Sequence, residues 1–213
     1  MCLYLSIDYS KAIKDISGLQ NTLNLSSHEH LRTIGGTNTL AYTAAVKAMY
    51  YTDGNGHSID APVGTSGWFL GSMGQWNIFL RNFCHVNGDD IQEIEPDYSG
   101  NEDYKDDEEL VAAYCENAGT VKSWGKPFVD AGYSNPFANL NLEYDEGYGV
   151  SVGFVTSTEI DYKRSWVISF DFTEIDDEEE DEEDWTNPNA SIDVSFIRYI
   201  KGQGLNIIPF LAF

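Results

Sequence analysis

The sequence predicts an α+β fold in which two or three helices pack on antiparallel sheets. Apolar residues recur at helical spacing in the first half of the chain, whereas they alternate at strand spacing in the second half. The apolar pattern continues through the 213 residues without an internal repeat or a linker. We therefore expect a single domain over residues 1–213, with a sizeable core and with acidic loop insertions near 86–109 and 173–190.

The first half is organised around residues 67–79, where a strand-like aromatic segment leads through a turn into a helix. Ser72 and Gln75 have the spacing of a capping box, in which two side chains satisfy backbone N–H groups at the start of a helix. We expect this helix over 73–84. Its buried face should be formed by the apolar residues Met73, Trp76, Leu80 and Phe83. Trp68, which precedes the cap, is expected in the core together with Trp76.

The other elements of the first half follow from shorter patterns. Alternating apolar residues predict a strand at 1–7, and turn-forming residues predict irregular chain over 8–38. Apolar residues at helical spacing predict a helix over 39–51. Another helix is expected over 106–118, because acidic residues suit its N-terminus and Gly119 suits its C-terminal cap.

The second half is predicted to consist mainly of strands. Residues 120–146 are expected to form loops rich in aromatic side chains, and such long loops are often functional. Strands are then predicted, in chain order, over 147–154, 166–172, 192–196 and 205–213. The inward-facing residues of the middle two are Trp166, Ile168, Phe170, Phe172, Ile192, Val194 and Phe196. Pro209 favours an edge position for the last strand, because proline cannot donate a hydrogen bond to a neighbouring strand.

The formal net charge of −23 restricts the classes of partner. It repels phosphate backbones and anionic lipid surfaces, so we expect no nucleic acid partner and no membrane partner. No run reaches the ~18 apolar residues of a membrane span, so membrane insertion is not expected. Nine consecutive acidic residues at 176–184 repel one another, and we expect a solvated loop that gathers divalent cations only weakly.

The three cysteines do not indicate a disulfide-stapled module or a zinc site. Cys2, Cys84 and Cys115 have no zinc-binding spacing and allow one disulfide at most. Cys84 and Cys115 lie within apolar patterns, so we expect them to be small buried side chains. The first residues resemble a strand and not a signal peptide. The chain is therefore expected to be cytoplasmic when made, or part of a longer exported protein, or carried outside by an assembly such as a virion.

Four segments, in this order along the chain, resemble the C-type-lectin-like domains of bacterial surface and phage proteins. This group includes the fimbrial-tip-like domains and the variable proteins diversified by retroelements. Gly67–Trp76 resembles its G-W-x-L-P-S-x-G-E-W segment, and Ser157–Glu159 followed by Trp166 resembles its S-S-T-E … W segment. The other two are Thr37–Thr39 and the closing Ile207–Phe213. Gly71, Gln75 and Ile208 depart from the family pattern, in which Pro, Glu and Arg stand at these places.

The resemblance implies a C-type-lectin-like fold whose first and last strands pair, so that Leu3–Ile7 would lie beside Ile207–Phe213. It also implies a non-catalytic domain that binds a glycan or a protein on a cell surface. The expected location is extracellular, on a cell or a virion, and otherwise cytoplasmic. The alternative is a structural subunit of a pilus tip or phage particle, whose contacts are mainly with its own assembly. The residues Trp68, Trp76, Ser157, Thr158, Glu159, Trp166, Pro209 and Phe213 are then scaffold landmarks.

Ligand contacts are expected in polar and aromatic loops beside these landmarks. Tyrosine, tryptophan and asparagine suit recognition because they bury area or adapt their hydrogen bonds at low entropic cost. Lys163 and Arg164 are adjacent cations in an acidic protein and can receive an anionic group. The candidate ligand-binding residues are Tyr133, Asn135, Asp161, Tyr162, Lys163, Arg164, Trp185, Asn187 and Asn189. Ordinary polar loops are an equally open interpretation of the same residues.

Calcium-dependent sugar binding and catalysis are both weakly indicated. Glu95–Asp97 and Trp185–Asn189 superficially resemble the calcium-binding segments of vertebrate C-type lectins, but their spacing does not fit well. No cofactor and no metal site are therefore expected, apart from weak calcium binding. An enzyme would need a nucleophile with its base or two poised carboxylates, and the sequence singles out neither arrangement.

Overall fold

The structure of the protein is a computed structural model that describes part of the chain. The described residues are 8–27, 31–34, 37–40, 43–52, 56–94, 109–135, 137, 143–145, 149–160, 164–173, 190–200, 205 and 207–212. The predicted strand at 1–7, the acidic run at 176–184 and Phe213 lie outside them. The expected pairing of Leu3–Ile7 with the last strand therefore stays a prediction.

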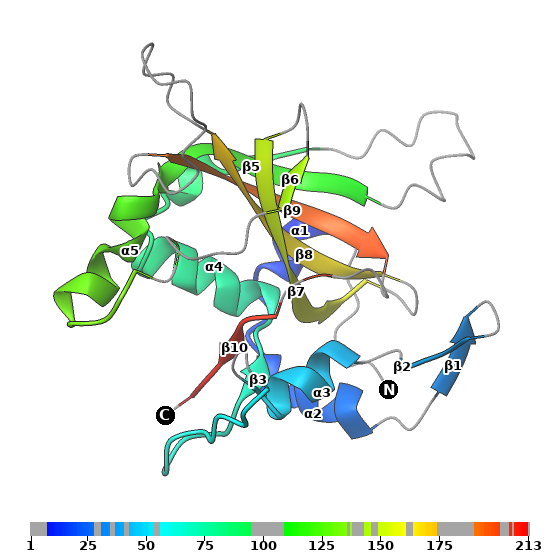
Figure 1. Ribbon diagram of the computed structural model, residues 1–213. Coiled ribbons are helices and arrows are strands. Elements are labelled where there is room, and N and C mark those ends of the chain that lie inside the picture. Colours follow the sequence, from blue (N-terminus) through cyan, green and yellow to red (C-terminus); the bar gives the residue numbers. More distant parts are fainter. Residues whose placement is uncertain are drawn as a thin grey trace, which may run out of the picture.

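A six-stranded antiparallel sheet forms the centre of the fold (Figure 1). Its strands run in the order β4-β5-β9-β8-β7-β6. Their bounds are β4 Gln92–Glu93, β5 Glu109–Thr120, β6 Glu143–Asp145, β7 Gly149–Glu159, β8 Arg164–Thr173 and β9 Ser191–Ile200. The three long strands β7, β8 and β9 pair over most of their length, so they make a continuous platform for the core.

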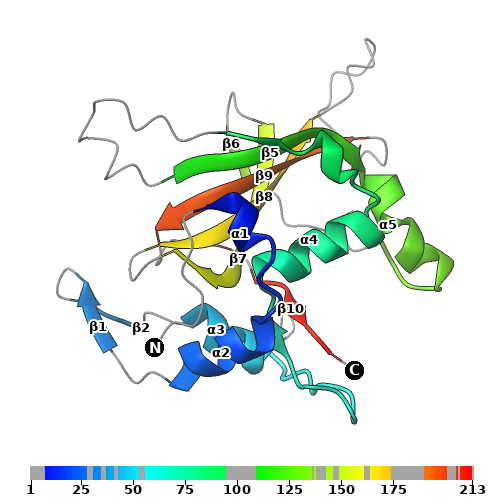
Figure 2. The same cartoon turned by 180° about the vertical axis from the view of Figure 1, so that it is seen from behind.

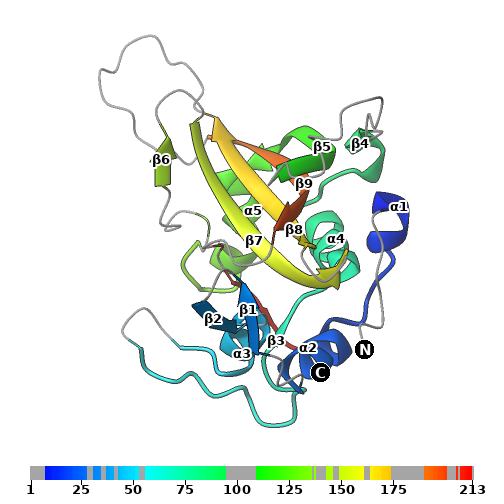
Figure 3. The ribbon, with the colours of Figure 1, turned by 90° about the vertical axis from the view of Figure 1, so that its right-hand side faces the viewer.

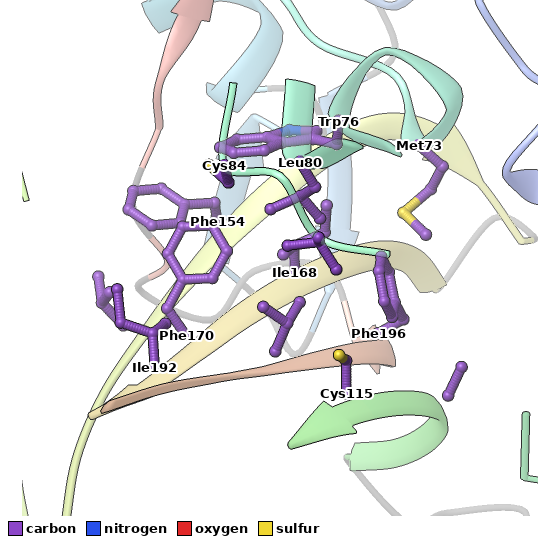
Figure 4. Packing of buried hydrophobic residues seen from close by; sticks show 14 of the residues in the cluster. Met73, Trp76, Leu80, Cys84, Cys115, Phe154, Ile168, Phe170, Ile192 and Phe196 are labelled. Atoms are coloured by element: carbon purple, nitrogen blue, oxygen red, sulfur yellow. The ribbon is translucent and has the colours of Figure 1, made fainter. Parts of the chain in front are cut away.

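One face of this sheet is covered by three helices. These are α1 (Tyr9–Ala12), α4 (Met73–Asn82) and α5 (Val121–Asp130). Figure 2 shows α1 and α4 crossing the sheet on this side. Trp76 of α4 and Trp124 of α5 both contact the ring of Phe170, with centroid distances of 6.0 and 5.2 Å. Figure 4 shows the side chains of α4 lying over those of the central strands.

A smaller layer lies at the end of the molecule away from the large sheet (Figure 3). It contains α2 (Gly18–Ser27), the hairpin of β1 (Leu31–Ile34) with β2 (Thr37–Leu40), and α3 (Thr43–Met49). It also contains a two-stranded sheet of β3 (Phe69–Leu70) and β10 (Pro209–Phe210). A short 3₁₀ turn at Gly88–Asp90 precedes β4. The described part of the chain is thus a mixed α+β structure with antiparallel sheets.

Several sequence predictions are confirmed. The helix over 73–84 is α4, and Ser72 and Gln75 form its capping box, in which Gln75 Oε1 accepts from the Ser72 N–H at 3.0 Å. The inward-facing residues predicted for β8 and β9 are all buried, and so are Cys84 and Cys115. Phe83 is the exception on the α4 face, since it is half exposed and stacks on Phe79.

The helix predicted over 106–118 is wrong, because the described residues of this segment, 109–118, belong to β5. Two irregularities in its pairing with β9, at Val111–Ala113 and at Cys115–Gly119, shift which residues face the core. β5 has one extra residue at the first irregularity and two at the second, and these residues interrupt the two-residue alternation of a strand. The apolar residues then recur at intervals that resemble a helix. Gly119 is part of the strand and does not cap a helix.

Other boundaries also differ from the predictions. Residues 8–38 are not irregular, because they contain α1, α2, β1 and part of β2. α2 is rich in Gly, Asn, Thr and Ser, which are weak helix formers, and it depends on tertiary contacts. The helix over 39–51 is shortened to α3, since Leu40 pairs with Leu31 in the hairpin. The segment 120–146, which was expected to form loops, includes α5. This helix was not predicted because it contains Gly125 and Pro127, which are poor helix formers.

The last strand is confirmed at an edge but is shorter than predicted. Pro209 pairs with Leu70 and Phe210 with Phe69. Trp76 lies in the core as expected, whereas Trp68 does not, because it is half-buried outside the main core cluster. Its indole N–H donates to the carbonyl of Ile59 at 2.7 Å. Within the described residues, no helix has the length and apolar character that crossing a lipid bilayer would require.

Candidate functional site

The landmark segments that carry the family resemblance meet in space. The Ser157 N–H donates to the carbonyl of Gly71 at 2.9 Å, and the Met73 N–H donates to Thr158 Oγ1 at 2.9 Å. The ring of Phe210 packs edge-on against Trp76, with a centroid distance of 5.1 Å. Three segments that are far apart in the sequence therefore form one buried junction, which we call the landmark junction.

Asp15 lies at the centre of the landmark junction and was not predicted as a site residue. Its side chain is 2% exposed. Asp15 Oδ2 accepts hydrogen bonds from Asn21 Nδ2 at 2.9 Å and from Thr158 Oγ1 at 2.7 Å. Asp15 Oδ1 accepts from the Ser17 N–H at 2.9 Å. The carboxylate thus has the convergent donors that a buried charge requires.

The backbone of Asp15 joins the same junction. Its carbonyl accepts from the Gly74 N–H at 2.8 Å and from the hydroxyl of Ser72. A Cβ atom on Gly74 would collide with this carbonyl, so the contact requires glycine at that position. Gly71, where the family pattern has proline, lets the ring of Phe210 approach, since a Cβ atom there would lie 2.6 Å from that ring.

The polar residues that β7 contributes to the landmark junction lie inside the protein. Ser157, Thr158 and Glu159 are all buried at the end of β7. The hydroxyl of Ser157 is buried and finds no hydrogen-bond partner within the part of the chain that the structure describes. This burial leaves no room for a ligand and supports the interpretation of these residues as scaffold.

Of the nine predicted ligand-binding residues, three lie within the described chain. Tyr133 is 71% exposed and follows α5. Asn135 is half-buried in the same turn, and Arg164 is half-buried at the start of β8. Arg164 closes the β7–β8 hairpin through its carbonyl, which accepts from the Ile160 N–H at 3.0 Å. The other six, Asp161, Tyr162, Lys163, Trp185, Asn187 and Asn189, lie outside the described residues.

Tyr133 is presented by a rigid turn at the end of α5. The Tyr133 N–H donates to the carbonyl of Phe128 at 2.9 Å, and the Gly132 N–H donates to the carbonyl of Val129 at 2.9 Å. Gly132 has a positive φ of 85°. This combination is the Schellman motif, which ends a helix with a left-handed glycine. Tyr133 therefore stands on a backbone whose hydrogen bonds are satisfied.

Asn135 holds this turn against the helix through both polar atoms of its side-chain amide. Its side-chain nitrogen donates to the carbonyl of Val121 at 3.0 Å, and its side-chain oxygen accepts from the Phe137 N–H at 2.9 Å. The amide also packs on Gly125, where a Cβ atom would collide with it. Tyr133 and Asn135, which were predicted together, thus have different environments. Tyr133 is exposed, whereas the Asn135 side chain is hydrogen-bonded within the protein.

A second polar group lies on the face of the sheet opposite to the helices. Asp171 of β8 accepts from the hydroxyls of Ser169 and Ser195, each at 3.3 Å. Burial raises the pKa of Asp171 above its usual range, and the charge of Asp193 raises it further, although the two serine hydrogen bonds act in the opposite direction. This group could not be predicted from the sequence, because only the pairing of β8 with β9 brings Asp171 close to Ser195.

Cys84, Cys115 and the described acidic residues do not form a reactive or metal-binding centre. Burial raises the pKa of the Cys84 thiol far above neutrality, and burial also raises the pKa of Cys115. The raised pKa keeps both free thiols protonated at neutral pH, which makes them poor nucleophiles. Among the described residues, no three His, Cys, Asp or Glu side chains are grouped so as to hold a metal ion. The calcium-like segments at 95–97 and 185–189 lie outside the described chain.

Comparisons of the chain with protein-family models, with curated proteins and with solved structures found no significant match. The geometry of the landmark junction and of the surface around it is therefore the basis on which we propose a function.

Proposed function

We propose that the chain is a C-type-lectin-like recognition domain that binds a glycan or a protein ligand outside the cell. The observation that carries this proposal is the landmark junction. Three of the four segments on which the resemblance depends contact one another, because Gly71 and Met73 bond to Ser157 and Thr158 and the ring of Phe210 packs on Trp76. Such convergence is what a shared scaffold requires, and a rigid scaffold frees the surface for recognition.

The turn after α5 is the described surface that best suits ligand contact. Tyr133 is 71% exposed and the neighbouring Val129 is 54% exposed. A tyrosine on a fixed backbone offers contact area at low entropic cost. Lys126 pairs with Asp130 at 2.7 Å and Lys122 is also exposed, so α5 lacks the strong negative charge of the whole chain. A neutral or anionic ligand meets less repulsion here than a net charge of −23 implies.

A non-catalytic role agrees with the chemistry of the described side chains. The buried thiols remain protonated, and Thr158 of the landmark junction donates to Asp15. Asp171 accepts from Ser169 and Ser195, and the groups that act on Asp171 in the described chain include no histidine or lysine. A serine needs such a base to become a nucleophile.

The proposal is tested by probing glycan and cell-surface protein arrays with the purified full chain, with and without calcium. Tyr133→Ala should weaken binding of any ligand found by about tenfold or more, which is the typical cost of losing an aromatic anchor. Tyr50→Ala is the matched control, because Tyr50 is 72% exposed and lies beyond α3 in the smaller layer. Both variants should retain the wild-type Tm.

Two results would count against the proposal. One is the absence of binding across both arrays with and without calcium. The other is turnover of a substrate that is abolished by replacing a single carboxylate or cysteine. If binding is found but Tyr133→Ala and Tyr50→Ala have equal affinity, the domain is a recognition module whose ligand lies elsewhere on the surface.

A further inference from the structure

Two aspartates face each other across the central strands of the large sheet. Asp171 of β8 and Asp193 of β9 are direct partners in the antiparallel register, and the next pair on the same face is Ser169 with Ser195. Side chains in directly opposite positions lie about 4.5–5.5 Å apart at Cβ, and like charges there are destabilising. A fold with 35 acidic residues thus places two of them side by side in its most extensively paired region.

The surroundings of Asp171 offer hydroxyl groups and no positive charge within the described chain. β7 contributes Ser151, which is the register partner of Asp171. β8 contributes Ser169, and β9 contributes Ser195 and Asp193. Beyond β9, strand β5 brings Tyr114 opposite Ser195, and its exposed Glu116 and Asn117 adjoin Asp193. The charged group that acts on Asp171 is Asp193.

The two carboxylates are held unequally. Asp193 Oδ1 accepts from the backbone N–H of Asn117 at 2.7 Å, which is a strong charge-assisted geometry. Asn117 has a positive φ of 49° within the irregular stretch of β5, and its side-chain oxygen accepts from Ser191 Oγ at 2.9 Å. Asp171 has only two serine hydrogen bonds at 3.3 Å. When one of the two must be neutral, the less firmly held carboxylate takes the proton.

We propose that Asp171 takes up a proton as the solution is acidified, and that the loss of its repulsion with the directly paired Asp193 strengthens the pairing of β8 with β9. The protonated carboxyl no longer repels Asp193, and it gains a donor where it had only acceptors. The bond from Asn117 to Asp193 is unaffected, so the register of β5 against β9 is kept. The centre of the sheet is therefore a pH-sensitive element that is tighter in acid than at neutral pH.

The direction of the effect follows from proton linkage. An aspartate in the unfolded chain titrates near a pKa of ~3.9. Because the folded pKa of Asp171 is raised, the folded protein binds this proton first as the pH falls. The destabilisation that Asp171 causes at neutral pH is relieved as the pH drops through its folded pKa. It has disappeared once the pH is below the unfolded value.

The test compares thermal unfolding of the wild-type chain and Asp171→Asn between pH 7 and pH 4. Asp171→Asn should be the more stable protein at pH 7, with a Tm higher by roughly 2–4 °C, and its advantage should shrink as the pH falls. Asp130→Asn is the control, because Asp130 is exposed and pairs with Lys126. The control should show no such convergence.

Carboxyl carbon NMR of the unmodified chain provides a second measurement that does not depend on how the variant folds. The Asp171 signal should titrate above the ordinary value of ~3.9. The proposal is overturned if Asp171 titrates at or below the ordinary value. It is also overturned if the stability difference between wild type and Asp171→Asn is the same at every pH.

Discussion

Asp15 and Asp171 both accept hydrogen bonds from neighbouring polar groups, but they differ in how well these bonds satisfy the carboxyl group. Asp15 is 2% exposed and accepts from Ser17, Asn21 and Thr158 at 2.7–2.9 Å. Asp171 is half-buried, has two serine partners at 3.3 Å and faces a second carboxylate. The more deeply buried residue is thus the better satisfied one.

The difference lies in what each residue joins. Asp15 connects the start of α2 to the loop before α4 and to the end of β7, so its partners come from segments that meet only in the native fold. Asp171 has partners on its own strand and on the adjacent one. A buried carboxylate with convergent donors can specify a fold, whereas an under-satisfied one destabilises it. Replacing each residue should therefore have opposite effects on the free energy of unfolding.

The largest expected effect is that of Asp15→Ala. The substitution leaves the buried donors of Asn21 and Thr158 without an acceptor and removes the link between three segments. We expect a loss of about 3–5 kcal/mol in the free energy of unfolding. Urea unfolding followed by circular dichroism measures it, with the exposed Asp130→Ala as control. A loss below about 1 kcal/mol would show that the junction does not depend on this carboxylate.

A smaller effect is expected for Thr158→Val, which keeps the shape of the side chain. Thr158 Oγ1 accepts from the Met73 N–H and donates to Asp15, so valine removes both bonds and leaves a buried N–H unpaired. We expect a loss of about 2–3 kcal/mol. Thr158→Ser retains the hydroxyl and should cost about half as much. Amide hydrogen exchange at Met73 should quicken in the valine variant only, and equal exchange in both variants would contradict the assigned bond.

The elements that depend on local patterns could be predicted from the sequence. α4 with its capping box and the alternation of Trp166–Phe172 and Ile192–Phe196 are set by neighbouring residues, and the structure contains them. β5 was predicted as a helix because two bulges disguise its alternation. α2 was missed because its helix depends on bonds such as that from Thr22 Oγ1 to the carbonyl of Leu70, which lies 48 residues away.

The candidate site was predictable to a similar extent. The landmark residues were predicted from the sequence as parts of the scaffold, but Asp15 was not. Its partner Thr158 is 143 residues away, and no local motif indicates the contact. The best available signal was Asp15 followed by Ser17, the spacing at which an aspartate accepts from the backbone two residues on. Tyr133 and Asn135 were predicted together as ligand contacts. Their different environments follow from the packing of Asn135 on Gly125, which the sequence does not reveal, while the ring of Tyr133 is exposed.

The smallest expected effect is that of Ser157→Ala, which removes a hydroxyl of the landmark junction that has no hydrogen-bond partner in the described chain. Ser157 adjoins Thr158 and is equally buried, yet its hydroxyl has no hydrogen-bond partner within the described chain. Alanine removes a desolvated polar group at the cost of little volume, so the free energy of unfolding should change by less than about 0.5 kcal/mol or increase slightly. The backbone bond from Ser157 to Gly71 does not involve the side chain and should persist. Urea unfolding of Ser157→Ala beside Thr158→Val isolates the hydroxyl that the junction uses. A loss of about 2 kcal/mol or more in the alanine variant would mean that Ser157 also has a partner in the folded protein.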